Sequence, residues 1–194
     1  MPDIPLAYLI TFRCYGTWLH GDERGSIDRR QNQHNSDYIM SNPNWHEYNV
    51  SHLKRDPVTL TDVQRQSVEA AIRETCRFRN WELRAINVRT NHVHTLVSTG
   101  ALKPERALNA LKANATRQLR QDGHWAHALT PWADGGSRRY VWTEVGINRA
   151  TEYIISGQDG QIPELDPPRT WRSGHRNDLR GQTVDSPIRY RGRF

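Results

Sequence analysis

The chain has 194 residues, a length that suits one domain with its own hydrophobic core. Hydrophobic residues make up 36% of the chain, and no apolar run is long enough for a membrane-spanning helix. Two cysteines are too few for a disulfide framework. The net charge of +6 makes nucleic acid the leading candidate for a partner, with a merely solvated charged surface as the alternative. We therefore expect a soluble, cytoplasmic protein.

Most of the positive charge lies near the C-terminal end. Residues 169–194 contain seven arginines and two aspartates, a net charge of +5, which leaves +1 for residues 1–168. From Pro163 onward the sequence is rich in Pro, Gly, Arg, Asp and Ser and has no hydrophobic period. We predict a single domain over residues 1–162 and a basic tail over residues 163–194 that is extended or disordered.

The first predicted element is a strand between Leu6 and Trp18, where partial apolar alternation favours burial on at least one face. Residues 20–59 follow without periodicity, and we interpret them as a long insertion loop. Aromatic residues in this loop either pin it to the body or stack on nucleic-acid bases, and we favour pinning. These residues are Tyr38, Trp45 and Tyr48.

The first long helix is predicted to begin at Thr59 or Thr61 and to end at Asn80, since Thr is a good N-cap and Asp62 suits the first turn. Its apolar stripe consists of Val63, Val68, Ala71, Ile72 and Cys76. A strand over residues 81–88 and a tight turn lead into a second strand over residues 90–97. Because the turn is so short, these two strands must pair antiparallel.

Pro104 marks the start of the second long helix. Its predicted buried residues are Ala107, Leu108, Leu111, Ala115 and Leu119. The last strand is predicted over residues 140–142, and a short helix over residues 147–156 follows. The order strand, helix, strand, strand, helix, strand is that of the α+β, ferredoxin-like βαββαβ fold with an antiparallel sheet. Both long helices would cover one face of the sheet, and the extra helix would lie beside the other.

Two histidines stand out in the strand over residues 90–97. His92 and His94 flank one aliphatic residue, so the pleat of a strand directs both imidazoles to the same face while Val93 points to the core. Two adjacent imidazoles form a bidentate site for a divalent metal ion. The alternative interpretation is that they are two unrelated polar residues on an exposed sheet face.

A third ligand and a nucleophile must come from elsewhere in the chain. The best candidates are in the helix over residues 147–156, which Gly157 ends. Tyr153 lies in the last turn of this helix, and Gln158 follows the glycine.

This pattern resembles the single-tyrosine HUH transposases of the smallest insertion sequences, in which a His-hydrophobic-His strand precedes a helix with one tyrosine. The closer resemblance is to the REP-associated tyrosine transposases. Three further stretches agree with it, and the resemblance covers about residues 6–160. These stretches are Tyr15-Gly16-Thr17-Trp18-Leu19-His20-Gly21, Trp81-Glu82-Leu83 and Gly136-Ser137-Arg138-Arg139-Tyr140-Val141-Trp142.

The resemblance implies a bacterial enzyme that nicks and rejoins single-stranded DNA with hairpins. It implies Mg²⁺ or Mn²⁺ on His92 and His94, and a covalent 5′-phosphotyrosine on Tyr153. In the family the ligand amide sits one helical turn after the tyrosine, a position that is Gly157 here. We therefore predict the next residue, Gln158, as the third ligand.

Basic residues near the predicted site are expected to bind phosphates, and those of the tail are expected to enter a groove. They are Lys112, Arg117, Arg138, Arg139, Arg189, Arg191 and Arg193. The chain is expected to act as a monomer or homodimer. Two other function classes stay open: a noncatalytic nucleic-acid-binding module on the same fold, and a His-x-His metal hydrolase without covalent catalysis.

Overall fold

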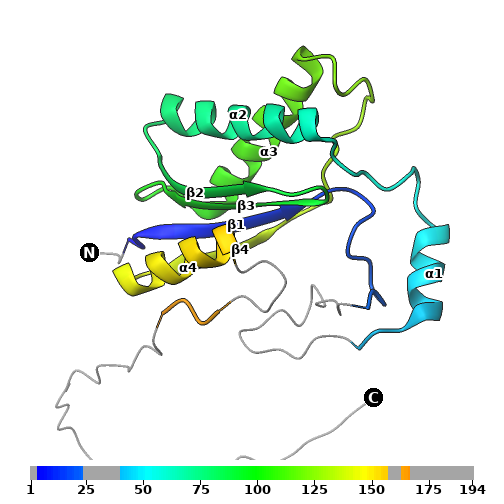
Figure 1. Cartoon of the computed structure of the whole chain (residues 1–194), viewed down its shortest axis with the longest axis horizontal. Coiled ribbons are helices and arrows are strands. Elements are labelled where there is room, and N and C mark those ends of the chain that lie inside the picture. Colours follow the sequence, from blue (N-terminus) through cyan, green and yellow to red (C-terminus); the bar gives the residue numbers. More distant parts are fainter. Residues whose placement is uncertain (1–3, 24–39, 157–162, 167–194) are drawn as a thin grey trace, which may run out of the picture.

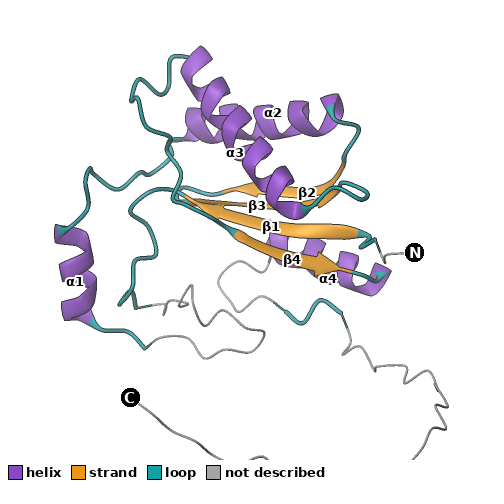
Figure 2. Cartoon of the chain, turned by 180° about the vertical axis from the view of Figure 1, so that it is seen from behind, coloured by secondary structure: helices purple, strands orange, loops and turns teal. Residues whose placement is uncertain are grey.

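The computed structural model describes residues 4–23, 40–156 and 163–166. Four strands form one antiparallel sheet in the order β2-β3-β1-β4, with bounds β1 Ala7–Arg13, β2 Glu82–Val88, β3 His92–Ser98 and β4 Ser137–Val141. The helices are α1 Pro43–Ser51, α2 Asp62–Phe78, α3 Pro104–Gln121 and α4 Glu144–Ser156. This strand order and these connections confirm the predicted α+β, ferredoxin-like fold with an additional helix that carries Tyr153 (Figures 1 and 2).

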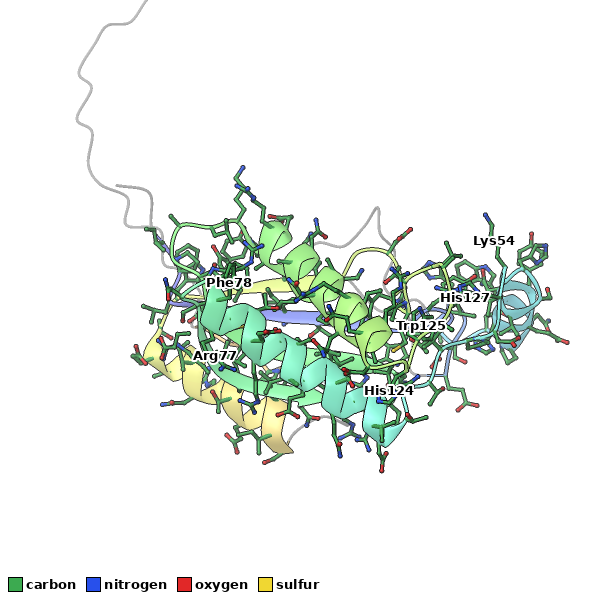
Figure 3. All side chains as sticks on the ribbon, turned by 90° about the horizontal axis from the view of Figure 1, so that it is seen from above. Lys54, Arg77, Phe78, His124, Trp125 and His127 are labelled. Carbon is green, nitrogen blue, oxygen red and sulfur yellow. The ribbon has the colours of Figure 1, made fainter. Side chains whose placement is uncertain are left out.

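The sheet has a helical layer on each face. Helices α2 and α3 cover one face, and α4 lies against the other (Figure 1). Seen from above, α2 and α3 lie side by side over the strands, with Phe78 at one end of the layer and Trp125 at the other (Figure 3). Within the described residues, no helix has the length and apolar character needed to cross a membrane.

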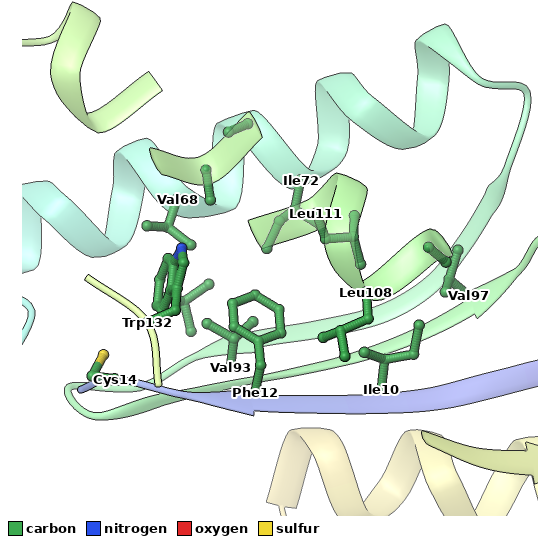
Figure 4. Packing of buried hydrophobic residues seen from close by; sticks show 14 of the residues in the cluster. Ile10, Phe12, Cys14, Val68, Ile72, Val93, Val97, Leu108, Leu111 and Trp132 are labelled. Atoms are coloured by element: carbon green, nitrogen blue, oxygen red, sulfur yellow. The ribbon is translucent and has the colours of Figure 1, made fainter. Parts of the chain in front are cut away.

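The pleat of the strands separates two hydrophobic clusters. Ile10, Phe12 and Val93 point toward α2 and α3 and pack there in the larger cluster (Figure 4). Leu9 and Leu96, which alternate with them along the strands, join the smaller cluster under α4. The face that carries the smaller cluster also carries the histidine pair.

Helix α2 begins with a capping box, in which the Thr61 hydroxyl accepts from the Gln64 main-chain N–H and the Gln64 side chain accepts from the Thr61 N–H. Four of the five residues of the predicted apolar stripe are buried. Val63 is 51% exposed, so its placement in the stripe is wrong. It lies in the first turn, beside the cap and away from the sheet. All five predicted core residues of α3 are buried, as expected.

Helix α1 lies within the stretch that we interpret as a loop. Asn42 caps it by accepting from the Trp45 N–H at 3.1 Å, and Pro43 occupies its first turn. No residue of α1 is buried, so the helix leaves no hydrophobic period in the sequence. It stands apart from the two layers, beyond the end of the sheet (Figures 1 and 2).

Two residues beyond the predicted domain boundary at 162 also contact the body. Leu165 is buried in the cluster under α4. The Asp166 carboxylate accepts from the main-chain N–H groups of Trp142 and Thr143 at 3.0 Å each, directly before α4 begins. The boundary itself stays a prediction.

Candidate active site

His92 and His94 lie side by side on β3, on the face that α4 covers. Their ring centroids are 4.6 Å apart and the rings are nearly perpendicular. The exposed fractions are 8% for His92 and 2% for His94. Both imidazoles are therefore buried next to each other, which does not fit the alternative of an exposed sheet face with unrelated polar residues.

Each ring has a hydrogen-bond partner at Nδ1. His94 Nδ1 lies 2.7 Å from Oγ1 of Thr11, its cross-strand neighbour on β1. His92 Nδ1 lies 2.6 Å from the side-chain oxygen of Asn91. An amide oxygen only accepts, so His92 donates from Nδ1; the same tautomer of His94 would donate to the Thr11 hydroxyl. In this tautomer the lone pair of each ring is on Nε2, the nitrogen that binds the ion in metal sites whose histidines are oriented by outer hydrogen bonds at Nδ1.

Burial keeps His94 neutral. The pKa of this imidazole falls to about 3, first because burial disfavours the charged form and then because of the nearby charges of His92 and Arg89. A neutral imidazole is the form that binds metal ions. His94 therefore needs no deprotonation to act as a ligand at neutral pH.

Tyr153 lies against the histidine pair. Its ring centroid is 5.4 Å from that of His94, edge to face, and the residue is 8% exposed. The apolar face of α4 holds it there, because Ala150 and Ile154 are fully buried against the sheet. In addition, Asn87 of β2 donates from its side-chain amide to the Ile154 carbonyl at 3.0 Å, and Asn87 is the cross-strand neighbour of His94.

A second aromatic residue, Trp18, contacts His92. The Trp18 ring lies 4.7 Å from the His92 ring, centroid to centroid. Trp18 has a φ of 53°, a left-handed conformation that is rare outside glycine. Arg13 donates to the Trp18 carbonyl at 2.6 Å, and Arg13 is the cross-strand neighbour of His92.

Comparison with known families gives one match, to the model described as "Transposase IS200 like", over residues 48–155. This span is more than half of the chain and includes both histidines and Tyr153. The chain belongs to the IS200-like transposase family.

Solved structures that align with this IS200-like transposase have low sequence identity to it. One, from Deinococcus radiodurans R1 and described as a "putative transposase", is 15% identical at a TM-score of 0.42, over 77% of this chain and 88% of that one. Another, described as a REP-associated tyrosine transposase bound to a REP hairpin, is 12% identical at a TM-score of 0.43, over 78% and 65%. A comparison with functionally curated proteins gives no match.

Of the four predicted DNA-binding residues that the structure describes, Arg139 shares the histidine face of the IS200-like transposase. Arg139 of β4 is the cross-strand neighbour of Leu9, whose side chain lies under α4. Arg138 is the neighbour of Ile10 and points to the helical layer, where it lies 3.6 Å from the Glu105 carboxylate.

The two predicted contacts on α3 lie in the helical layer, away from the histidines. Lys112 Nζ donates to the carbonyls of Ala133 and Gly135 at 2.6 and 3.1 Å. Burial lowers its pKa from the ordinary lysine value. Lys112 and Arg117 both line a cavity of about 670 Å³ beside α3. If these residues bind DNA, they do so on the opposite face from the site.

The remaining predicted site residues lie outside the described part of the transposase. They are Gln158, Arg189, Arg191 and Arg193. Among the residues that the structure does describe, no three His, Cys, Asp or Glu side chains gather closely enough to hold a metal ion. Two imidazoles are therefore adjacent in the described part of the chain, and their role as metal ligands, like that of a third ligand from outside the described ranges, stays a prediction.

Sequence reasoning assigned no role to several residues that shape this site. Pairing of the strands brings Thr11 and Asn87 next to His94, whereas Trp18 reaches His92 from the loop that follows β1. Asn91 could have been found, because it directly precedes His92 and an amide next to a ligand histidine is well placed to orient it.

Proposed function

We propose that this member of the family is a metal-dependent enzyme that nicks single-stranded DNA and transfers strands through a covalent 5′-phosphotyrosine on Tyr153. The observation that carries the proposal is the packing of the Tyr153 ring, 5.4 Å from His94, against two buried histidines whose Nδ1 atoms are both hydrogen-bonded. A tyrosine that served only to pack α4 would not require a pair of oriented imidazoles beside it.

Mg²⁺ or Mn²⁺ is the proposed metal, since two neutral imidazoles can ligate a divalent ion whose remaining positions take oxygen ligands. His92 and His94 would hold it through Nε2, with Gln158 proposed as the third ligand. The bound ion would supply a Lewis acid for a non-bridging phosphate oxygen. Thr11 and Asn91 keep the two rings in the orientation that directs Nε2 away from the strand.

Tyr153 supplies the nucleophile in this proposal. Its Oη forms a bond to the phosphorus while the bond from phosphorus to the 3′-oxygen breaks, and the phenolic proton passes to solvent. The 3′-oxygen leaves as a hydroxyl after taking up a proton. Because the phosphoester energy is kept in the tyrosyl bond, a 3′-hydroxyl can attack in reverse and rejoin strands without ATP.

The proposed substrate is single-stranded DNA with hairpins. The family and the net charge of +6 support a nucleic-acid partner. Arg89 and Arg139 are described cations placed to bind a phosphate near the site, since the charge of Arg89 acts on His94 and Arg139 lies on the same face.

The test is formation of a covalent protein–DNA band. Labelled single-stranded hairpin oligonucleotides are incubated with the full chain and Mn²⁺ and run on a denaturing protein gel. Wild type should give the band and Tyr153→Phe should not, because Phe has the ring but no hydroxyl. The matched control is Tyr140→Phe, since Tyr140 is the cross-strand neighbour of Tyr8 on the helical face.

Three outcomes separate the alternatives. Cleavage that persists in Tyr153→Phe would favour a metal hydrolase without covalent catalysis. DNA binding without cleavage, over a range of hairpins and metals, would favour a noncatalytic binding module. Cleavage and Mn²⁺ binding that survive both His92→Ala and His94→Ala would remove the metal site from the mechanism.

A further inference from the structure

A series of aromatic rings leads from the histidine pair toward α1. The Trp18 ring is 4.7 Å from the His92 ring. Two residues further along the same loop, the His20 ring stacks on Trp45 of α1, with centroids 5.1 Å apart and planes 13° apart. The loop leaves β1 directly after Arg13, the neighbour of His92, and α1 lies beyond the end of the sheet (Figure 1). The first ring pair is therefore at the site and the second is at α1.

The backbone of this loop is held by specific contacts. Besides the bond from Arg13 to Trp18, the Thr17 hydroxyl donates to the Cys14 carbonyl at 2.7 Å. Gly21 has a φ of 91°, and a Cβ added there would lie 2.4 Å from the Asn42 carbonyl oxygen, so only glycine allows α1 to approach this closely. The Asn49 side chain of α1 donates to the His20 carbonyl at 3.1 Å. The rings are thus fixed in place before any ligand arrives.

Trp45 keeps exposed ring surface among the described residues. Trp45 is 39% exposed, and α1 contributes no buried residue. Glu47 is its one acidic residue, and the helix has no lysine or arginine, so its surface offers flat apolar rings and little charge. At the other end of the series, Arg13 is the cross-strand neighbour of His92, and the charge of Arg89 acts on His94. Rings that continue from a charged site match a single-stranded nucleic acid, whose phosphates seek cations and whose bases stack on aromatic side chains.

We propose that Trp18 and the stacked His20–Trp45 pair form a stacking surface for unpaired bases next to the scissile phosphate. The inference rests on the proposed function, because it assumes that the phosphate lies at the histidine pair. It assigns to the loop after β1 the recognition of the single-stranded flank. A base beside the phosphate would meet Trp18, and a base further along the strand would meet Trp45.

The experiment combines protein variants with abasic DNA. Full-length wild type, Trp18→Leu, Trp18→Phe and Trp45→Ala are titrated with a hairpin that has a single-stranded flank, either intact or with one base removed at each flank position in turn. Leucine at position 18 still covers His92 but has no ring to stack, whereas phenylalanine keeps a ring. The matched control is Tyr48→Ala, because Tyr48 is an exposed aromatic residue of the same helix whose ring contacts His52.

Wild type should lose affinity between about fivefold and a hundredfold when the base that stacks on either tryptophan is absent. Trp18→Leu should already bind intact DNA with this reduced affinity. Removing the base that stacks on Trp18 should then cause no further loss for this variant. Trp18→Phe should retain most of the affinity for intact DNA. Trp45→Ala should behave in the same way at a different flank position. Tyr48→Ala should match wild type throughout.

The inference would be overturned if the loss of affinity from each tryptophan substitution and the loss from each missing base were additive at every flank position. The inference would also be overturned if Trp45→Ala bound DNA like wild type but had a lower molar mass than wild type in sedimentation. In that case α1 would be an interface between copies of the chain. The covalent-adduct assay reports separately on the proposed function. If the adduct depends on Tyr153 but the two affinity losses are additive, the stacking surface is refuted and the nucleophile is not. If the two affinity losses are not additive but no adduct forms, the nucleophile is refuted and the stacking surface is not.

Discussion

The side-chain amide of Asn87 on β2 donates to the main-chain carbonyl of Ile154 on α4, at 3.0 Å. That carbonyl belongs to the last turn of α4. Since Tyr153 is the adjacent residue and His94 is the strand neighbour of Asn87, one hydrogen bond connects the strands of the histidine site to the helix of the tyrosine.

Asn87→Leu should weaken this connection. We expect a loss of about 1 kcal/mol in the free energy of unfolding and a drop of about tenfold or more in the rate of adduct formation, with hairpin affinity unchanged. The control is Asn114→Leu, because Asn114 makes the same kind of bond, to the Ala110 carbonyl at 3.0 Å, on α3. If both variants formed adduct at the same reduced rate, Asn87 would have no special role in placing the tyrosine.

Thr11→Val should lower the affinity for Mn²⁺ by about 10- to 100-fold, as loss of an outer partner of a ligand histidine usually does. Valine keeps the shape of threonine but cannot hold His94 Nδ1. Calorimetry measures the affinity directly, without DNA. Thr95→Val is the matched control, because Thr95 is fully buried on β3 and points to the opposite face of the sheet. Equal Mn²⁺ affinities for the two variants would contradict the proposed ligand orientation.

His94 should make the fold sensitive to acid. Its pKa is lowered by burial to about 3 in the folded state from an ordinary value of 6.5, so between these pH values the unfolded chain binds a proton that the folded chain does not. Stability should therefore fall as the pH falls, by about 1.4 kcal/mol per pH unit from this residue. Denaturant unfolding at pH 6, 5 and 4, in the presence of a chelator, measures the free energy of unfolding. This free energy should depend less steeply on pH for His94→Asn than for wild type. Parallel curves for the variant and wild type would refute this.

Deletion of residues 169–194 should weaken DNA binding and reduce its dependence on salt. The deletion removes seven arginines, and each lost phosphate contact lowers the slope of log affinity against log salt by about 0.7 for a single strand. Fluorescence titrations at several salt concentrations measure the slope. An unchanged slope would mean that Arg189, Arg191 and Arg193 do not contact DNA.

The fold could be predicted because its signals are local and regular. The helices α2 and α3 have strong apolar stripes and clear start residues, and the short turn before β3 fixes the pairing of β2 with β3. Helix α1 was missed because it buries nothing. Its start signals, Asn42 and Pro43, were present, but they carry little weight without periodicity.

The candidate site likewise has features that the local sequence predicts and features that it does not. The two histidines share a face because of the pleat alone, so their spacing in the sequence predicts it. The roles of Thr11 and Asn87 depend on which residues face each other across β1, β3 and β2, which no local pattern encodes. The same holds for Arg138 and Arg139, whose opposite faces follow from the register of β4 against β1.

The separation of the two hydrophobic clusters by the sheet has a consequence for motion. The histidines lie on β3, a central strand with hydrogen-bonded neighbours on both sides, whereas Tyr153 lies on a helix attached through the smaller cluster. Helix α4 can therefore detach as a separate cooperative unit while the sheet and its larger cluster stay folded. In hydrogen–deuterium exchange, the amides of α4 should exchange well before those of β3, and the proposed nucleophile would be able to leave the histidine pair without global unfolding.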